Sequence, residues 1–200
     1  IEGCPVNYSL SSDYTVGANA GTTHAIVVNL GSNPNYNVTT NSGTLTVVKA
    51  NYVGITHPAV DGGVYNPNKT LADHALNANF SWVDSTITPT VGNAGYQVVY
   101  NADPTNYNDL FLSSVKVNLT KAPVVIGGST TQTIDYTAGA PYTFNQQALT
   151  VSYNGTQLGG VFEFTGVSTY TVASTYQFTA VLSHQNYEGS VLCTFIIKSV

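Results

Sequence analysis

One stretch of the chain decides the fold because the sequence repeats it: residues 35–50 read NYNVTTNSGTLTVVKA. Residues 106–122 read NYNDLFLSSVKVNLTKA, and residues 186–199 read NYEGSVLCTFIIKS. Each copy opens on an Asn-Tyr pair and closes on an apolar segment followed by lysine, and successive copies begin 71 and 80 residues apart. A period of this size predicts a tandem array of small structural units.

The segments between turns alternate apolar and polar residues and show no helical period. In one of them Val115, Val117 and Leu119 share one face, and Lys116 and Asn118 share the other. This is the pattern of an antiparallel strand with one solvated side. We therefore expect an all-β fold, a tandem array of small antiparallel Ig-like β-sandwich domains that forms a rod. The alternating segments are 23–30, 45–49, 97–100, 115–119 and 176–182.

Matching the repeats places the domain boundaries and shows that the first unit lacks its opening strands. The segment VNYSL at 6–10 corresponds to ANFSW at 78–82, yet only five residues precede the former. Such a unit exposes apolar core and an unpaired sheet edge. Either a longer array was cut there, or another copy supplies the missing strand by donor-strand complementation. The predicted units are 1–49 (incomplete), 50–121 and 122–200.

The composition excludes several classes of function. Charged residues make up 8% of the chain, with a net charge of −5, five lysines and no arginine. This argues against nucleic-acid binding, which relies on clustered basic side chains. No apolar run approaches the roughly 20 residues that span a bilayer, so we expect no membrane insertion. The uncharged polar surface predicts an extracellular or cell-surface protein.

Three motifs resemble the MBG/YDG-type, bacterial Ig-like repeats of cell-surface and adhesin proteins. The segment 35–50 is similar to the closing signature of these repeats. Residues 64–71, VYNPNKTL, resemble their opening, with Asn66 where a Tyr-Asp-Gly turn has Asp. Residues 93–96, NAGY, are similar to their Ala-Gly-Thr-Tyr segment. The resemblance implies a stalk or adhesin module with a compact all-β domain and no catalytic residues.

The two cysteines, Cys4 and Cys193, lie in the first and last predicted units. In a rod they are too far apart to be bridged, because bridged Cα atoms lie within about 7 Å. Aligning Lys198 with Lys121 places Cys193, Phe195 and Ile197 on the outward face of the last strand. We therefore predict an intersubunit contact there with a Cys4–Cys193 disulfide between copies. Two buried free thiols and an intrachain bridge are the alternatives.

Nothing in the sequence predicts catalysis, a metal site or a cofactor. The four histidines have no metal-ligand spacing, and no Gly-x-Ser-x-Gly nucleophile motif occurs. The recurrence of Tyr36, Tyr107 and Tyr187 at equivalent positions predicts that they pack the repeats. We expect a structural subunit or stalk segment of a bacterial surface fibre, whose partner is another copy head to tail or a flanking repeat. The alternative is an adhesin module that binds a glycan or a host protein.

Overall fold

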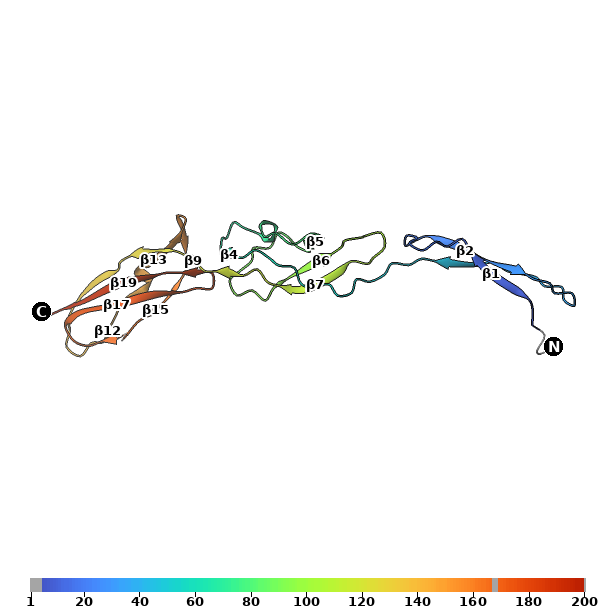
Figure 1. The fold of residues 1–200 in the computed structure, drawn as a ribbon. Helices are drawn as coiled ribbons and strands as arrows, with labels where there is room; N and C mark the ends of the chain where they lie inside the picture. Colours follow the sequence, from blue (N-terminus) through green and yellow to red (C-terminus); the bar gives the residue numbers. More distant parts are fainter. Residues whose placement is uncertain (1–4, 167–168, 200) are drawn as a thin grey trace. The chain divides into compact units, whose positions relative to one another are not determined.

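Short strands joined by turns make up the fold of residues 5–166 and 169–199, which the computed structural model describes (Figure 1). The predicted all-β class is confirmed: within these residues the strands form several separate sheets, accompanied by two short 3-10 helices. In chain order the strands are β1 (Tyr8–Ser12), β2 (Thr23–Leu30), β3 (Gly43–Thr46), β4 (Gly63–Val64), β5 (Phe80–Trp82), β6 (Tyr96–Tyr100), β7 (Leu110–Val115), β8 (Leu119–Thr120), β9 (Ala122–Pro123), β10 (Val125–Gly128), β11 (Thr131–Asp135), β12 (Tyr142–Thr143), β13 (Leu149–Tyr153), β14 (Thr156–Leu158), β15 (Val161–Phe164), β16 (Thr169–Tyr170), β17 (Ser174–Ser183), β18 (Tyr187–Glu188) and β19 (Ser190–Lys198). The helices are η1 (Leu71–Asp73) and η2 (Gln146–Ala148).

The chain folds into two compact units. Unit 1 comprises residues 1–58, 77–83 and 97–113, and unit 2 comprises residues 59–76, 84–96 and 114–200. The three predicted repeats, with boundaries after residues 49 and 121, stay a prediction.

A three-stranded arrangement occurs three times along the chain. Its strand orders are β1-β2-β3, β5-β6-β7 and β15-β17-β19, with neighbours in the list hydrogen-bonded to each other. The first and third are antiparallel throughout. In each arrangement an Asn-Tyr pair lies in the connection that leads to the third strand. The sequence repeat therefore corresponds to a repeated element of structure.

The sheet β1-β2-β3 of unit 1 has one apolar face that is largely open. Along β2, His24, Ile26 and Val28 are half-buried while the residues between them are exposed. Leu10 of β1 lies opposite Val28 and shares its face, because paired residues of antiparallel strands project to the same side. Leu10 is nevertheless 61% exposed. This sheet therefore leaves apolar side chains of β1 and β2 accessible on one face.

Unit 2 contains the main hydrophobic core. It lies between the sheet β10-β13-β14 and the sheet β11-β19-β17-β15. Val151 of β13 contributes from one side, and Phe178 of β17 and Phe195 of β19 contribute from the other. Phe144 packs edge-on against both phenylalanines, with ring centroids 5.1 and 6.1 Å away. Edge-to-face packing of this kind stabilises a core beyond the area that it buries.

The predicted outward face of the last strand is wrong. Cys193, Phe195 and Ile197 are 0%, 3% and 2% exposed and point into the core, whereas Leu192 is 59% exposed. A shift of one residue turns every side chain of a strand to the other face. The shift arises because β19 is continuous over nine residues, whereas the corresponding segment breaks between β7 and β8. The inward or outward direction of a side chain therefore cannot be copied from one repeat to another by its distance from the lysine.

Candidate functional site

The connection between β6 and β7 holds the segment that follows β3. The backbone carbonyl of Asn106 accepts a hydrogen bond from the Ala50 N–H at 2.9 Å, and the Asn108 N–H donates to the Ala50 carbonyl at 2.9 Å. The side-chain Oδ1 of Asn106 also accepts a hydrogen bond from the Ala20 N–H, in the loop between β1 and β2, at 2.9 Å. One asparagine therefore joins two separate segments of unit 1.

Neighbouring side chains support this contact. Tyr52 stacks on Tyr107, with ring centroids 4.5 Å apart and an interplanar angle of 14°. The Lys49 Nζ donates to the carbonyl of Pro104 at 2.7 Å. Asn106 Nδ2 donates to Asp103 at 3.0 Å, and this bond is the main reason that the pKa of the Asp103 carboxyl lies below its ordinary value. The loop is thus ordered around Asn106.

Unit 2 contains a contact of the same construction, centred on Asn186. The Asn186 carbonyl accepts a hydrogen bond from the Ala122 N–H at 2.9 Å, and β9 runs parallel to β18 beyond it. The Asn186 Oδ1 accepts a hydrogen bond from the Val91 N–H at 2.9 Å. Gln185 adds a bond from its Nε2 to the Val91 carbonyl at 3.2 Å. We call these two contacts the Asn106 joint and the Asn186 joint.

The two joints share three features. In each, the asparagine backbone carbonyl accepts a hydrogen bond from the N–H of the alanine that follows a lysine. The asparagine side-chain oxygen accepts a backbone N–H from the loop before the middle strand of a three-stranded arrangement, β2 in one joint and β6 in the other. The tyrosine after the asparagine pairs in parallel with the same alanine. The sequence interpretation emphasised the tyrosines and missed the asparagines. Their signal was present, because Asn precedes the tyrosine in all three copies. The arrangement is a hydrogen-bonded clamp.

The three predicted packing tyrosines have different surroundings. Tyr187 is 5% exposed and packs against Tyr65 and Tyr153, with centroids 5.3 and 5.2 Å away. Tyr107 is half-buried against Tyr52. Tyr36 is 38% exposed. The packing role of these tyrosines stays a prediction.

The predicted cysteine link involves a residue outside the described part of the chain, Cys4. Cys193 is a free, fully buried thiol. Burial raises the pKa of this thiol, and a backbone hydrogen bond from Ala180 opposes part of the shift. The thiolate is the reactive form, so the buried Cys193 is held in its unreactive state.

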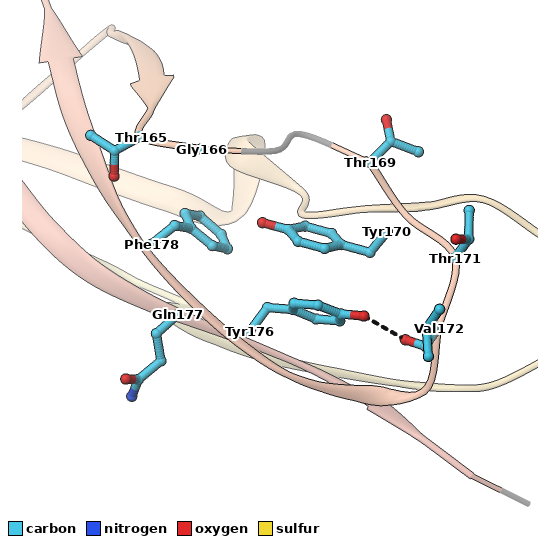
Figure 2. A pocket seen from close by; sticks show the side chains of 9 residues that line it. All are labelled: Thr165, Gly166, Thr169, Tyr170, Thr171, Val172, Tyr176, Gln177 and Phe178. Atoms are coloured by element: carbon cyan, nitrogen blue, oxygen red, sulfur yellow. Dashed lines mark hydrogen bonds between the residues drawn. The ribbon is translucent and has the colours of Figure 1, made fainter.

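An aromatic pocket of about 350 Å³ lies in unit 2, lined by residues of β16 and of the first half of β17 (Figure 2). Tyr170 and Tyr176 lie against each other there, with centroids 4.2 Å apart and an angle of 34°. The Tyr176 hydroxyl donates to the Val172 carbonyl at 2.9 Å, and Phe178 lies next to Tyr170. Burial, followed by the neighbouring Tyr176, raises the pKa of Tyr170. The pocket offers aromatic faces and uncharged polar groups.

The described residues contain no group of three or more His, Cys, Asp and Glu side chains that could hold a metal ion. None of the helices found in residues 5–166 and 169–199 has the length and apolar character needed to cross a membrane. No protein-family model, no curated protein and no solved structure matches the chain.

Proposed function

We propose that the chain is a structural subunit or stalk segment of an extracellular bacterial surface fibre. In this proposal residues 1–49, 50–121 and 122–200 are tandem Ig-like repeats of a rod, and neighbouring repeats stack in one dimension. The work of such a protein is mechanical, so it needs rigid connections between repeats and no catalytic groups. Its surface carries few charges, with 8% charged residues.

The observation that supports this proposal is the recurrence of the asparagine joint. The Asn106 and Asn186 joints use the same backbone and side-chain bonds at equivalent places in successive sequence copies. A linker without such bonds would behave as a flexible tether. Two hydrogen-bonded connections in succession are instead suited to holding an extended protein in a defined form.

The proposal is tested by immunogold electron microscopy with antibodies raised against the purified chain. Cells that produce the protein should carry gold along surface projections, and pre-absorption of the antibody with the chain should abolish the label. Label confined to the cell interior would contradict the proposal. Negative staining of the purified protein adds a second readout, since self-assembly gives long uniform filaments.

The aromatic pocket favours a second candidate, a glycan-binding adhesin module. Sugar rings stack on tyrosine faces, and the pocket is lined by Tyr170 and Tyr176 together with three threonines. A glycan array should then yield ligands whose binding is lost in Tyr176→Ala and retained in Tyr8→Ala. Tyr8 is the matched control because it is a 58% exposed aromatic residue outside the pocket. Equal loss in both variants, or no ligand, would reject this function.

A further inference from the structure

The chain presents two surfaces that correspond to the two halves of an asparagine joint. The first half is the connection between β2 and β3, which contains Asn35 and Tyr36. Asn35 is exposed and makes none of the bonds to the described residues that Asn106 and Asn186 make in their joints. The neighbouring Asn33 instead holds the loop locally, by accepting from the Asn7 N–H at 2.7 Å and donating to the Asn7 carbonyl at 3.0 Å. The loop is thus ordered while Asn35 faces solvent.

The second half follows β19 at the far end of the sequence. A hollow of about 390 Å³ lies there between Ala173, at the entry to β17, and Ser199, the exposed residue after Lys198. In the Asn106 joint a hollow of about 330 Å³ lies at the matching place, between Ala20 and Ala50. The residues that line it from the other side are Asp103, Asn106 and Tyr107.

The two observed joints indicate which residues would pair in a third joint. Ala50 is the parallel bridge partner of Tyr107, and Ala122 is the parallel partner of Tyr187. Each alanine directly follows the lysine that ends its sequence copy, and Ser199 holds this position after Lys198. Ser199 should therefore pair with a tyrosine of an Asn-Tyr loop. Of the three such loops, the Asn35–Tyr36 loop is the one whose asparagine makes no joint bond to the described residues.

We propose that Ser199 and the Ala173 loop of one copy receive the Asn35–Tyr36 loop of a second copy of this chain. The Asn35 carbonyl accepts the Ser199 N–H, and the Asn35 side-chain oxygen accepts a backbone N–H of the loop that enters β17. This inference rests on the proposed fibre function and names the surfaces that would join its subunits. Because the two surfaces differ, the contact is heterologous and repeats from copy to copy without closing, which builds a filament.

The test traps the proposed contact covalently. Two full-length preparations each lack Cys4 through Cys4→Ser; one carries Tyr36→Cys, and the other carries Ser199→Cys and a mass tag. Mixed under mild oxidation, they should form the mixed dimer in excess over both homodimers. A double variant with Ala50→Cys and Tyr107→Cys is the matched positive control, since it places thiols at the same positions of the Asn106 joint.

Adding Asn35→Ala to the Tyr36→Cys preparation should slow formation of the mixed dimer about tenfold. The substitution removes the side-chain oxygen of Asn35, so the backbone N–H of the loop that enters β17 loses its acceptor. Asn41→Ala, an exposed asparagine in the same connection, should leave the rate unchanged. If the Ala50→Cys/Tyr107→Cys control cross-links and the mixed dimer does not form in excess, the proposed contact between copies is rejected. In that case, immunogold label on surface projections would still support the proposed fibre function. Formation of the mixed dimer without surface label would instead contradict the fibre function and support the contact between copies.

Discussion

Asn186 accepts a hydrogen bond through its side-chain oxygen from the backbone N–H of Val91, 95 residues earlier in the chain, at 2.9 Å. The same residue accepts the Ala122 N–H through its carbonyl. Asn186 is 9% exposed, so its bonds form largely away from water. Asn186 therefore bonds two distant segments of unit 2, one through its side chain and one through its backbone carbonyl.

Replacing this side chain should destabilise unit 2. Asn186→Ala leaves the partly buried Val91 N–H without its acceptor, and the cost of an unpaired buried donor is about 1–3 kcal/mol. The free energy of unfolding, measured with urea and near-ultraviolet circular dichroism, should fall by this amount. Asn118→Ala removes an exposed asparagine and should change the value by less than about 0.5 kcal/mol. Equal losses in both variants would refute the structural role of Asn186.

Two nearby glycines should respond differently to alanine. Gly95 has φ +102°, and a Cβ there would lie 2.4 Å from the Ser114 carbonyl carbon. Gly92 has φ +69° and nothing within 4 Å of such a Cβ. Gly92→Ala should cost about 1 kcal/mol from backbone strain alone, and Gly95→Ala about 2–4 kcal/mol because a steric clash adds to the strain. Thermal unfolding of the two variants checks the order, which would be reversed or lost if Ser114 were not packed against Gly95.

The Cys193 thiol should react slowly in the folded protein. In Cys4→Ser, labelling by a chromogenic disulfide reagent should be about 100-fold slower than in urea, because the buried thiol must first be uncovered. The matched control moves the thiol by one position, through Cys193→Ala and Leu192→Cys in the same background. Leu192 is 59% exposed, so the moved thiol should react rapidly. Fast labelling of Cys193 itself would mean that the strand has the opposite phase.

Alkaline pH should weaken the fold through Tyr187. Burial, followed by Tyr65 and Tyr153, raises the pKa of Tyr187 above 10.0, so the folded state keeps a proton that the unfolded chain loses. The contribution to stability is complete below pH 10 and falls as the pH rises above it. Tyr187→Phe should therefore show a smaller loss of unfolding free energy between about pH 9 and 11. The exposed Tyr8→Phe should keep the full loss, and an unchanged slope in Tyr187→Phe would contradict the assignment.

Much of the fold was predictable because alternation of apolar and polar residues is a local property. The predicted strand 23–30 coincides with β2, and 176–182 lies within β17. For segment 115–119 the predicted inward side chains are correct, since Val115 and Val117 are each 2% exposed. The predicted continuous strand is wrong, because β7 ends at Val115 and β8 begins only at Leu119. Ser114 has φ +64° next to this break, and the Asn118 carbonyl accepts the Gly63 N–H. Such bonds depend on distant segments, which alternation does not encode.

The site was less predictable than the fold, for a related reason. The recurrence of Asn-Tyr marked the position of the joints, yet side-chain size directed attention to the tyrosines. Which of the two residues holds the neighbouring segment depends on the direction of backbone N–H groups such as those of Ala20 and Val91. That direction follows from loop conformation, which sequence alternation leaves undetermined.

The asparagine joint also bears on how such a chain can change over generations. It requires from its neighbour only backbone N–H and carbonyl groups, which every residue except proline supplies in full. A duplicated, deleted or shuffled repeat would meet the same groups at its border without matching changes in the adjacent unit. A gene that encodes joints of this kind can alter the length of its product by recombination while each border remains compatible.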